Sequence, residues 1–277
     1  MSAYYGKTRT PCMIVMFLIG LMVAPANAQT TRQQEPAKEL MVDLGGGVHM
    51  CLVWIPAGSF KMGDAKGPVY EQPVHQVNVT KPFYLGKYEV TQEQWQAVMG
   101  NNPSYFKSPT NPVENVSWID CQSFARRINE KFAIAGEKYA LPTEAQWEYA
   151  CRAASSTRFF FGDDGKALGD YAWYDDNSGN KTHPVGRKRP NAWGLYDMLG
   201  NAWEWCQDWY GADYYAKSPT DDPTGPPAGT GRSIGHVARG GSWDYPAGQY
   251  RTLFRDYDAP EYKLDNLSFR IARIAAV

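Results

Sequence analysis

Residues 190–210, PNAWGLYDMLGNAWEWCQDWY, are the most informative stretch of this chain of 277 residues. Asp197, Gly200, Ala202 and Glu204 lie close together within it. Two carboxylates and two backbone carbonyls are hard oxygen ligands of the kind that Ca²⁺ prefers, and glycine lets the backbone curl around an ion. The alternative is an aromatic core loop whose acidic residues cap helices. Spacing alone leaves both interpretations open.

Upstream of this stretch, capping patterns predict helices that begin after Thr91, Ser117 and Thr143. A Pro-Ala-Gly turn within 51–64 predicts two short strands around it, and alternation of apolar and polar residues in 75–90 predicts a half-buried strand pair. After residue 152 glycine, proline, asparagine and aspartate dominate between aromatic residues. We therefore expect an α+β fold in one domain, with little regular secondary structure and long loops.

The first 28 residues have the composition of a secretory signal peptide. Lys7 and Arg9 precede the apolar run CMIVMFLIGLMV, and APANA follows it, which predicts cleavage after Ala28. The run is too short to span a bilayer, so we expect a periplasmic or secreted chain with no membrane attachment after cleavage. Residues 29–44 then form a flexible lead, and 45–277 form the domain.

Four cysteines remain after cleavage, and an oxidising compartment would allow them to form disulfides. More than one pairing is open, and the sequence does not choose among Cys51, Cys121, Cys151 and Cys206. The net charge of −1 provides no basic face for nucleic acid, and we expect a monomer.

Several linked motifs resemble those of the formylglycine-generating enzyme, or sulfatase-modifying factor, family. They occur in the family's order and are VWIPAGSFKMGD (53–64), YEVTQEQW (88–95), LPTEAQWEYACRA (141–153), PNAWGLYDMLGNAWEW (190–205), VARGGSW (237–243) and NLSFR (266–270). The resemblance covers about residues 45–275. It implies a single formylglycine-generating-enzyme fold, related to C-type lectin folds.

The resemblance also implies structural calcium. The family's ligand positions within GLYDMLGNAWEW fall on Asp197, Gly200, Ala202 and Glu204. This adds a family expectation to the spacing argument above.

The oxidising members of the family convert a sulfatase cysteine to formylglycine with O₂, and bind Cu(I) between two cysteines that follow the GGS motif. Aligned from Ser242, those positions are Tyr245 and Tyr250, and no cysteine lies beyond Cys206. Cu(I) is soft and prefers thiolate, whereas a neutral phenol is a hard, weak ligand. We therefore do not expect copper in this chain.

Three functions remain open. The first is a formylglycine-generating-enzyme-like protein with different or lost chemistry that keeps a groove for a peptide or small molecule. The second is a different periplasmic oxidase, as in pyoverdine maturation, and the third is a ligand-binding module of the lectin-like branch. The groove candidates are Trp203, Ser242, Tyr245, Tyr250, Arg251, Arg255, Asp256 and Asn266. Contact residues should be partly exposed around a cavity, whereas tyrosines that only fill the missing metal site should be buried.

Overall fold

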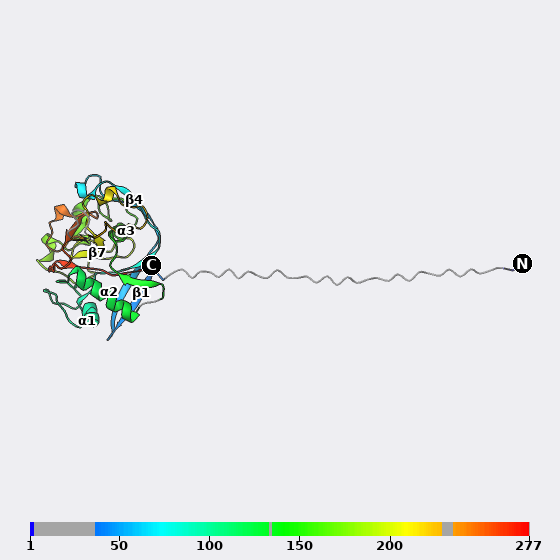
Figure 1. Ribbon diagram of the computed structural model, residues 1–277, viewed down its shortest axis with the longest axis horizontal. Helices are drawn as coiled ribbons and strands as arrows, with labels where there is room; N and C mark the ends of the chain where they lie inside the picture. The colour runs from blue at the N-terminus through cyan, green and yellow to red at the C-terminus, as the bar shows by residue number, and fades with distance from the viewer. Residues whose placement is uncertain (3–36, 133–134, 229–234, 277) are drawn as a thin grey trace. The chain divides into compact units, whose positions relative to one another are not determined.

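The computed structural model describes residues 1–2, 37–132, 135–228 and 235–276. The residues described from 37 onward belong to one compact unit, shown in Figure 1. The predicted signal peptide lies almost wholly outside the described residues, as does the first half of the predicted lead. Within the described ranges, no helix is long and apolar enough to cross a membrane.

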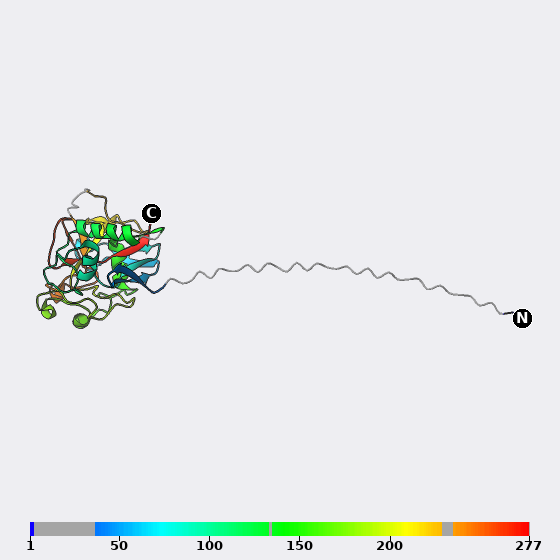
Figure 2. The ribbon, with the colours of Figure 1, turned by 90° about the horizontal axis from the view of Figure 1, so that it is seen from below.

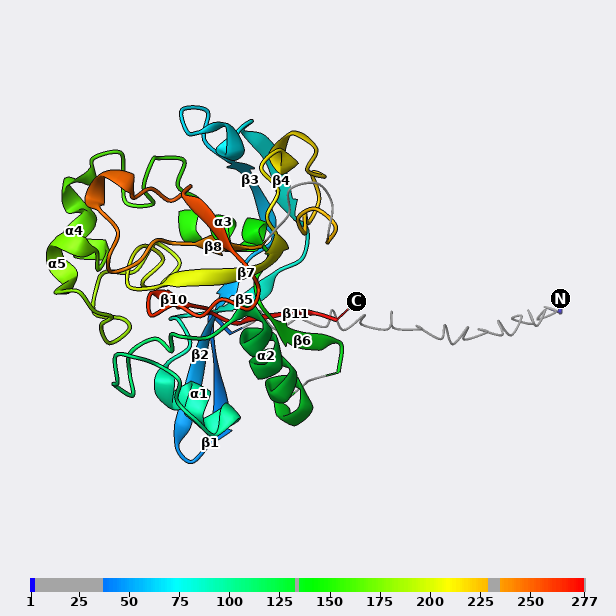
Figure 3. The same cartoon turned by 60° about the vertical axis from the view of Figure 1, so that its left-hand side comes forward.

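The largest sheet is antiparallel and has five strands in the order β1-β2-β5-β11-β6. Helices α1 and α2 pack on it and on each other, as Figures 2 and 3 show. The strands are β1 (Glu39–Gly45), β2 (Val48–Ile55), β5 (Phe83–Gly86), β6 (Glu137–Ala140) and β11 (Ala272–Ala275), and the helices are α1 (Gln92–Met99) and α2 (Trp118–Phe132).

A second sheet carries the C-terminal segment. Its four strands have the order β10-β7-β8-β9, and helix α3 (Glu144–Arg152) packs on β7 and β8. A separate ribbon pairs β3 with β4. The bounds are β7 (Trp203–Trp209), β8 (His236–Arg239), β9 (Arg255–Asp258), β10 (Leu267–Ser268), β3 (Gly58–Met62) and β4 (His75–Val79).

Short helical turns interrupt the long loops. They are η1 (Val69–Glu71), η2 (Gly165–Ala167), α4 (Leu168–Tyr171), α5 (Asp175–Ser178), η3 (Tyr214–Ala216) and η4 (Ala247–Gln249). Large aromatic residues fill the hydrophobic core, and Trp147, Trp205, Phe124 and Phe269 are fully buried. The expected α+β fold with short strands and long aromatic-rich loops is therefore confirmed.

The predicted helix starts are confirmed because their capping interactions are local. The Thr91 hydroxyl accepts from the Gln94 amide, and the Thr143 hydroxyl accepts from the Gln146 amide. In the third case the Ser117 hydroxyl accepts from the Asp120 amide. Each contact satisfies an amide that has no partner inside the helix.

The structure corrects one expectation and bears on a question about the cysteines that the sequence left open. Residues 39–44 are not a flexible lead, because they form most of β1 and pair with β2. Leu40, Val42 and Leu44 alternate along this strand, and Val42 and Leu44 enter the hydrophobic core. The described cysteines also form no disulfide: Cys121, Cys151 and Cys206 are buried free thiols, and Cys51 is a partly exposed one.

Candidate functional site at the C-terminal segment

The C-terminal segment leaves β8 through a tight turn at Gly240 and Gly241. Both have positive φ angles, +99° and +79°. A Cβ on Gly241 would lie 2.6 Å from Cε1 of Tyr250, so only glycine allows this ring to pack here. In Figure 3 the segment that follows, drawn in orange, runs beside α4 and α5.

Tyr250 is a core residue. Its side chain is 2% exposed and packs with Leu168, Ala172 and Leu199. The phenol donates a hydrogen bond to the carbonyl oxygen of Ser242, and burial raises the pKa of the phenol well above its usual value. Tyr250 therefore fills the space at its position instead of facing a ligand.

Tyr245 lies next to Tyr250 but is only half-buried. Its ring meets Trp203 edge to face, with the ring centroids 5.3 Å apart, and lies 5.3 Å from Phe254. Burial raises the pKa of the Tyr245 phenol, and Asp256 contributes next. Of the two tyrosines at the copper positions, only Tyr245 has the exposure of a contact residue.

A small polar cluster lies beside Tyr245 and depends on Asp244. The Ser242 hydroxyl donates to Oδ1 of Asp244 at 2.5 Å. The Asn266 amide donates to both carboxylate oxygens of Asp244, at 3.2 and 3.1 Å. Ser242 is fully buried, whereas Asp244 is exposed. Asp244 thus presents the one exposed carboxylate of this cluster, and no motif in the sequence indicated it.

The two arginines of the predicted groove point elsewhere. Arg255 is 2% exposed and donates to both oxygens of Glu144, at 2.8 and 2.7 Å. Arg251 donates to Glu71. Arg255 is thus part of the core and does not line the predicted groove. Asp256, the neighbour of Arg255, is half-buried, and burial raises the pKa of its carboxyl.

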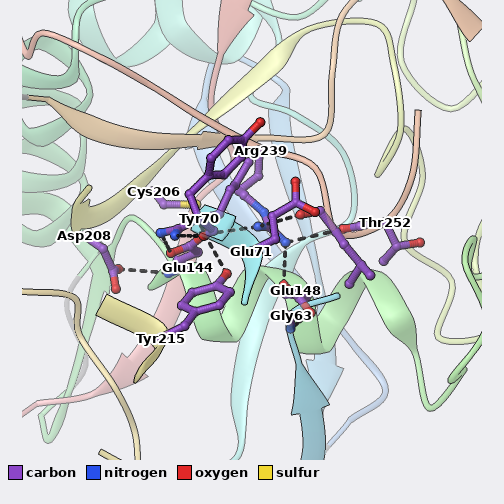
Figure 4. A network of polar contacts seen from close by, with 12 residues as sticks. Gly63, Tyr70, Glu71, Glu144, Glu148, Cys206, Asp208, Tyr215, Arg239 and Thr252 are labelled. Carbon is purple, nitrogen blue, oxygen red and sulfur yellow. Dashed lines mark hydrogen bonds and ion pairs between the residues drawn. The ribbon is translucent and has the colours of Figure 1, made fainter. Parts of the chain in front are cut away.

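Arg255 shares Glu144 with Arg239 in a buried ionic network. Figure 4 shows Glu144, Glu148 and Arg239 of this network. Arg239 donates to Glu144 at 3.1 Å and to Glu148 at 2.6 Å. Burial alone would raise the pKa of Glu148, but Arg152 and Arg239 lower it, so its carboxylate stays charged. Because every member of this network is buried and paired, it fixes α3 against β8 and β9.

The predicted calcium ligands differ in how their oxygens are used. Glu204 receives two hydrogen bonds from Arg270, both 2.6 Å long, and one from the Trp147 indole at 2.7 Å. Asp197 accepts from the Gly186 amide through Oδ2, while its buried Oδ1 has no partner among the described residues. The hydrogen bonds therefore engage both oxygens of Glu204 but only one oxygen of Asp197.

Glu89 adds a third carboxylate to this region that the sequence did not single out. It is fully buried, and its Oε2 also lacks a partner within the described chain. Burial, followed by the charges of Asp197 and Glu204, raises the pKa of Glu89 well above its usual range. Burial also raises the pKa of Asp197 to about 6.

No group of three or more His, Cys, Asp or Glu side chains in the described ranges is placed to hold one metal ion. Glu89, Asp197 and Glu204 lie close enough to affect one another's pKa, but Arg270 and Trp147 already engage Glu204. Any ion here would rely on Asp197 and backbone carbonyls. The two buried carboxylate oxygens without a partner, on Glu89 and Asp197, are compatible with such an ion.

Comparison with known proteins identifies the chain's relatives. The model of the sulfatase-modifying factor enzyme 1-like domain matches residues 49–275. The formylglycine-generating enzyme of Streptomyces coelicolor is 31% identical, over 80% of this chain and 89% of its own length. The enzyme of Bos taurus is 32% identical over 76% of this chain and 58% of its own length.

Solved structures agree with this result. Treponema denticola variable protein 1 superposes with a TM-score of 0.76 at 30% identity, over 86% of this chain and 99% of its own. PvdO from Pseudomonas aeruginosa gives a TM-score of 0.74 at 28% identity, again over 86% and 99%. Fold, motifs and comparisons coincide, and the chain belongs to the formylglycine-generating enzyme, or sulfatase-modifying factor, family.

Proposed function

We propose that this chain is an exported family member that does not oxidise cysteine with copper and that binds a peptide or small molecule beside Tyr245. One observation carries the proposal. The positions where the oxidising relatives are expected to hold Cu(I) are occupied by Tyr245 and Tyr250, and Tyr250 is locked into the core by its hydrogen bond to Ser242. A neutral buried phenol is a poor ligand for a soft metal ion.

The remaining thiols do not supply a substitute pair. Cu(I) prefers the thiolate form of cysteine, and burial raises the pKa of Cys121, Cys151 and Cys206 above the usual thiol value. Burial, followed by a hydrogen bond to Glu39, raises the pKa of Cys51 to about 11. Each thiol therefore stays protonated at neutral pH.

The proposed ligand site is formed by Tyr245 and the polar cluster of Ser242, Asp244 and Asn266. Trp203 packs edge to face against the Tyr245 ring and is itself only 5% exposed. It therefore holds the Tyr245 ring in place and does not contact the ligand. An aromatic ring next to an exposed carboxylate suits a ligand with an apolar part and a hydrogen-bond donor or positive charge. An extended peptide or a small polar molecule has this chemistry.

We also propose structural calcium near Asp197. The free Oδ1 of Asp197 and the carbonyl oxygens of Gly200 and Ala202 would hold the ion, and the unpartnered Oε2 of Glu89 lies in the same buried region. When bound, calcium would supply charge neutralisation for buried carboxylates and thereby stabilise this loop. The proposed role of the ion is structural only.

Two alternatives follow from the relatives. The first is a ligand-binding module of the lectin-like branch, which the match to Treponema denticola variable protein 1 favours. The second is a different periplasmic oxidase, which the similar match to PvdO favours. Both would use the surface beside Tyr245, so the copper test below does not choose between them. We also propose that the chain is periplasmic or secreted and monomeric.

Copper binding provides the direct test. The purified chain is titrated with Cu(I) in competition with a chromophoric chelator, next to the formylglycine-generating enzyme of Streptomyces coelicolor. We expect this chain to take no copper from the chelator, because Tyr245 and Tyr250 offer it no sulfur ligand. Stoichiometric uptake of Cu(I) by the wild type would contradict the proposal.

A further inference from the structure

A large cavity lies away from the polar cluster around Asp244. Its volume is about 980 Å³, within the range of small-molecule sites. Residues of 59–68, 149–158 and 251–253 line it, and these segments are far apart in the sequence. Neither Tyr245 nor Ser242 lines it, so the cavity is separate from the ligand site proposed above and does not depend on it.

Two arginines in the cavity wall are held in fixed positions by buried glutamates. Arg251 donates from Nη2 and Nε to the two oxygens of Glu71, at 2.5 and 3.1 Å. Arg152 donates from Nη2 and Nε to Oε1 of Glu148, at 2.9 and 3.0 Å. Both glutamates are fully buried.

These pairs leave one edge of each guanidinium available. Each arginine uses its Nε and Nη2 on the glutamate, and Nη1 has no partner in the described part of the chain. Arg152 and Arg251 both line the cavity. The ion pairs already fix the positions of both arginine side chains. Binding of an anion to Nη1 would therefore cost little side-chain conformational entropy.

The loop over Glu71 maintains this arrangement. Gly63 has φ +95°, and a Cβ there would lie 2.6 Å from the Glu71 carbonyl oxygen. A Cβ on Gly67 would lie 2.4 Å from the Glu71 carboxylate. The amide of Gly63 also donates to Glu148 at 3.2 Å. The close approach of this loop therefore excludes water from both glutamates that orient the arginines.

The rim adds cations that are free to meet a ligand. Lys61, Lys66 and Arg158 line the cavity, are exposed, and form no ion pair with any described residue. The two carboxylates at the cavity, Asp64 and Asp163, each accept a backbone amide of their own loop, and Oδ2 of Asp64 also lies 3.9 Å from Nε of Arg251. The lining thus has five cationic and two anionic side chains, in a protein whose net charge is −1.

Another part of the cavity wall is apolar. Phe60 and Tyr149 lie with ring centroids 5.3 Å apart, and Val74 is 39% exposed. Leu253 completes this surface next to Arg251. A ring or short aliphatic body would cover these groups, while an inorganic ion alone would leave them in water.

We propose that this cavity is a binding site for a small organic anion. The anionic group, a sulfate, phosphate or carboxylate, accepts hydrogen bonds from Nη1 of Arg152 and Arg251 and is attracted by Lys61, Lys66 and Arg158. The apolar body of the ligand packs on Phe60 and Tyr149. Planar guanidiniums suit oxyanions of all three kinds, so the probes must distinguish among them.

Calorimetric titration of the full chain tests the site with matched probes. These are 2-naphthyl sulfate, 2-naphthyl phosphate and 2-naphthoate, with neutral 2-naphthol and inorganic sulfate as references. We expect saturable binding of at least one naphthyl anion, and binding of 2-naphthol and of inorganic sulfate at least about tenfold weaker. Affinity should fall as NaCl is raised from about 50 to about 500 mM.

Variants locate the binding. Lys66→Ala/Arg158→Ala should weaken the preferred anion by about tenfold, since it removes two exposed cations of the rim. The control Arg126→Ala/Lys131→Ala removes two exposed cations of α2 outside the cavity and should leave affinity unchanged. All four positions are exposed, so both variants should melt like the wild type.

Three outcomes would overturn this proposal. They are no saturable binding of any naphthyl anion, equal binding of 2-naphthol or inorganic sulfate, and equal loss of affinity in the rim variant and the α2 control. None of them bears on copper or on Tyr245, so failure here leaves the proposed function to be judged by its own test.

Discussion

Replacing Tyr250 by alanine should destabilise the protein strongly, because the structure makes this residue part of the core. The ring is 2% exposed and fits against Gly241, and its phenol donates to the Ser242 carbonyl oxygen. Loss of a buried aromatic side chain costs about 3–5 kcal/mol. For a domain of this size, each kcal/mol lowers the Tm by roughly 2–4 °C, so the melting temperature should fall by about 6–20 °C.

Further variants separate the contributions. Tyr250→Phe keeps the ring and removes only the hydrogen bond, which should cost about 1 kcal/mol. Tyr245→Ala removes a half-buried ring and should cost clearly less than Tyr250→Ala. Tyr262→Ala serves as the control, since Tyr262 is 53% exposed and its loss should change stability by at most about 0.5 kcal/mol.

The assay is urea unfolding followed by tryptophan fluorescence. A loss below about 1 kcal/mol for Tyr250→Ala would refute the assignment of Tyr250 to the core, because it would mean that the ring packs against little. In that case both tyrosines could again line a groove together.

Other predictions address the calcium site, the pH dependence and the ionic network. If calcium binds at Asp197, a hundredfold excess over its Kd should stabilise the fold by about 2.7 kcal/mol. A chelator should then lower the Tm of the wild type, and Asp197→Ala should abolish this effect. A wild-type Tm that does not change with chelator, together with no metal in the purified protein, would count against the site. Burial, followed by the charge of Asp256, raises the pKa of Asp258 from 3.8 to about 6, so the folded state holds a proton that the unfolded chain releases between these values. The wild type should therefore lose stability relative to Asp258→Asn as pH rises from about 4 to about 7, and parallel stability curves for the two proteins would show that the pKa is not raised. Arg255→Met should lower the free energy of unfolding by about 3 kcal/mol, because it leaves the buried Glu144 with one cation fewer. An unchanged urea midpoint would mean that Arg239 alone is enough to compensate the charge of Glu144.

Local structure was predictable from the sequence, because its causes lie within a few residues. The capping pairs that begin α1, α2 and α3 join positions three apart, so they can be read directly. The turn signal in 51–64 and the alternation in 75–90 likewise indicated strands. It did not indicate their partners: β4 pairs with β3, whereas β5 lies between β2 and β11 in another sheet.

The site was predictable only in part, because its geometry depends on contacts between distant segments. The alignment brought Ser242, Tyr245 and Asn266 into one place, as the structure has them. It could not show that Tyr250 turns into the core, which follows from packing against Leu168 and Gly241. Nor could it show that Arg251 pairs with Glu71 and lines a different cavity, since these two residues are 180 positions apart.

The most direct test of the central claim is an assay for formylglycine. The purified chain is incubated with Cu(I), O₂ and a peptide that contains a CxPxR motif, and the products are analysed by mass spectrometry. The formylglycine-generating enzyme of Streptomyces coelicolor, run in parallel, serves as the positive control. We predict that the peptide cysteine stays unmodified, because Tyr245 and Tyr250 provide no thiolates for copper. Formation of the aldehyde over repeated turnovers would contradict this account.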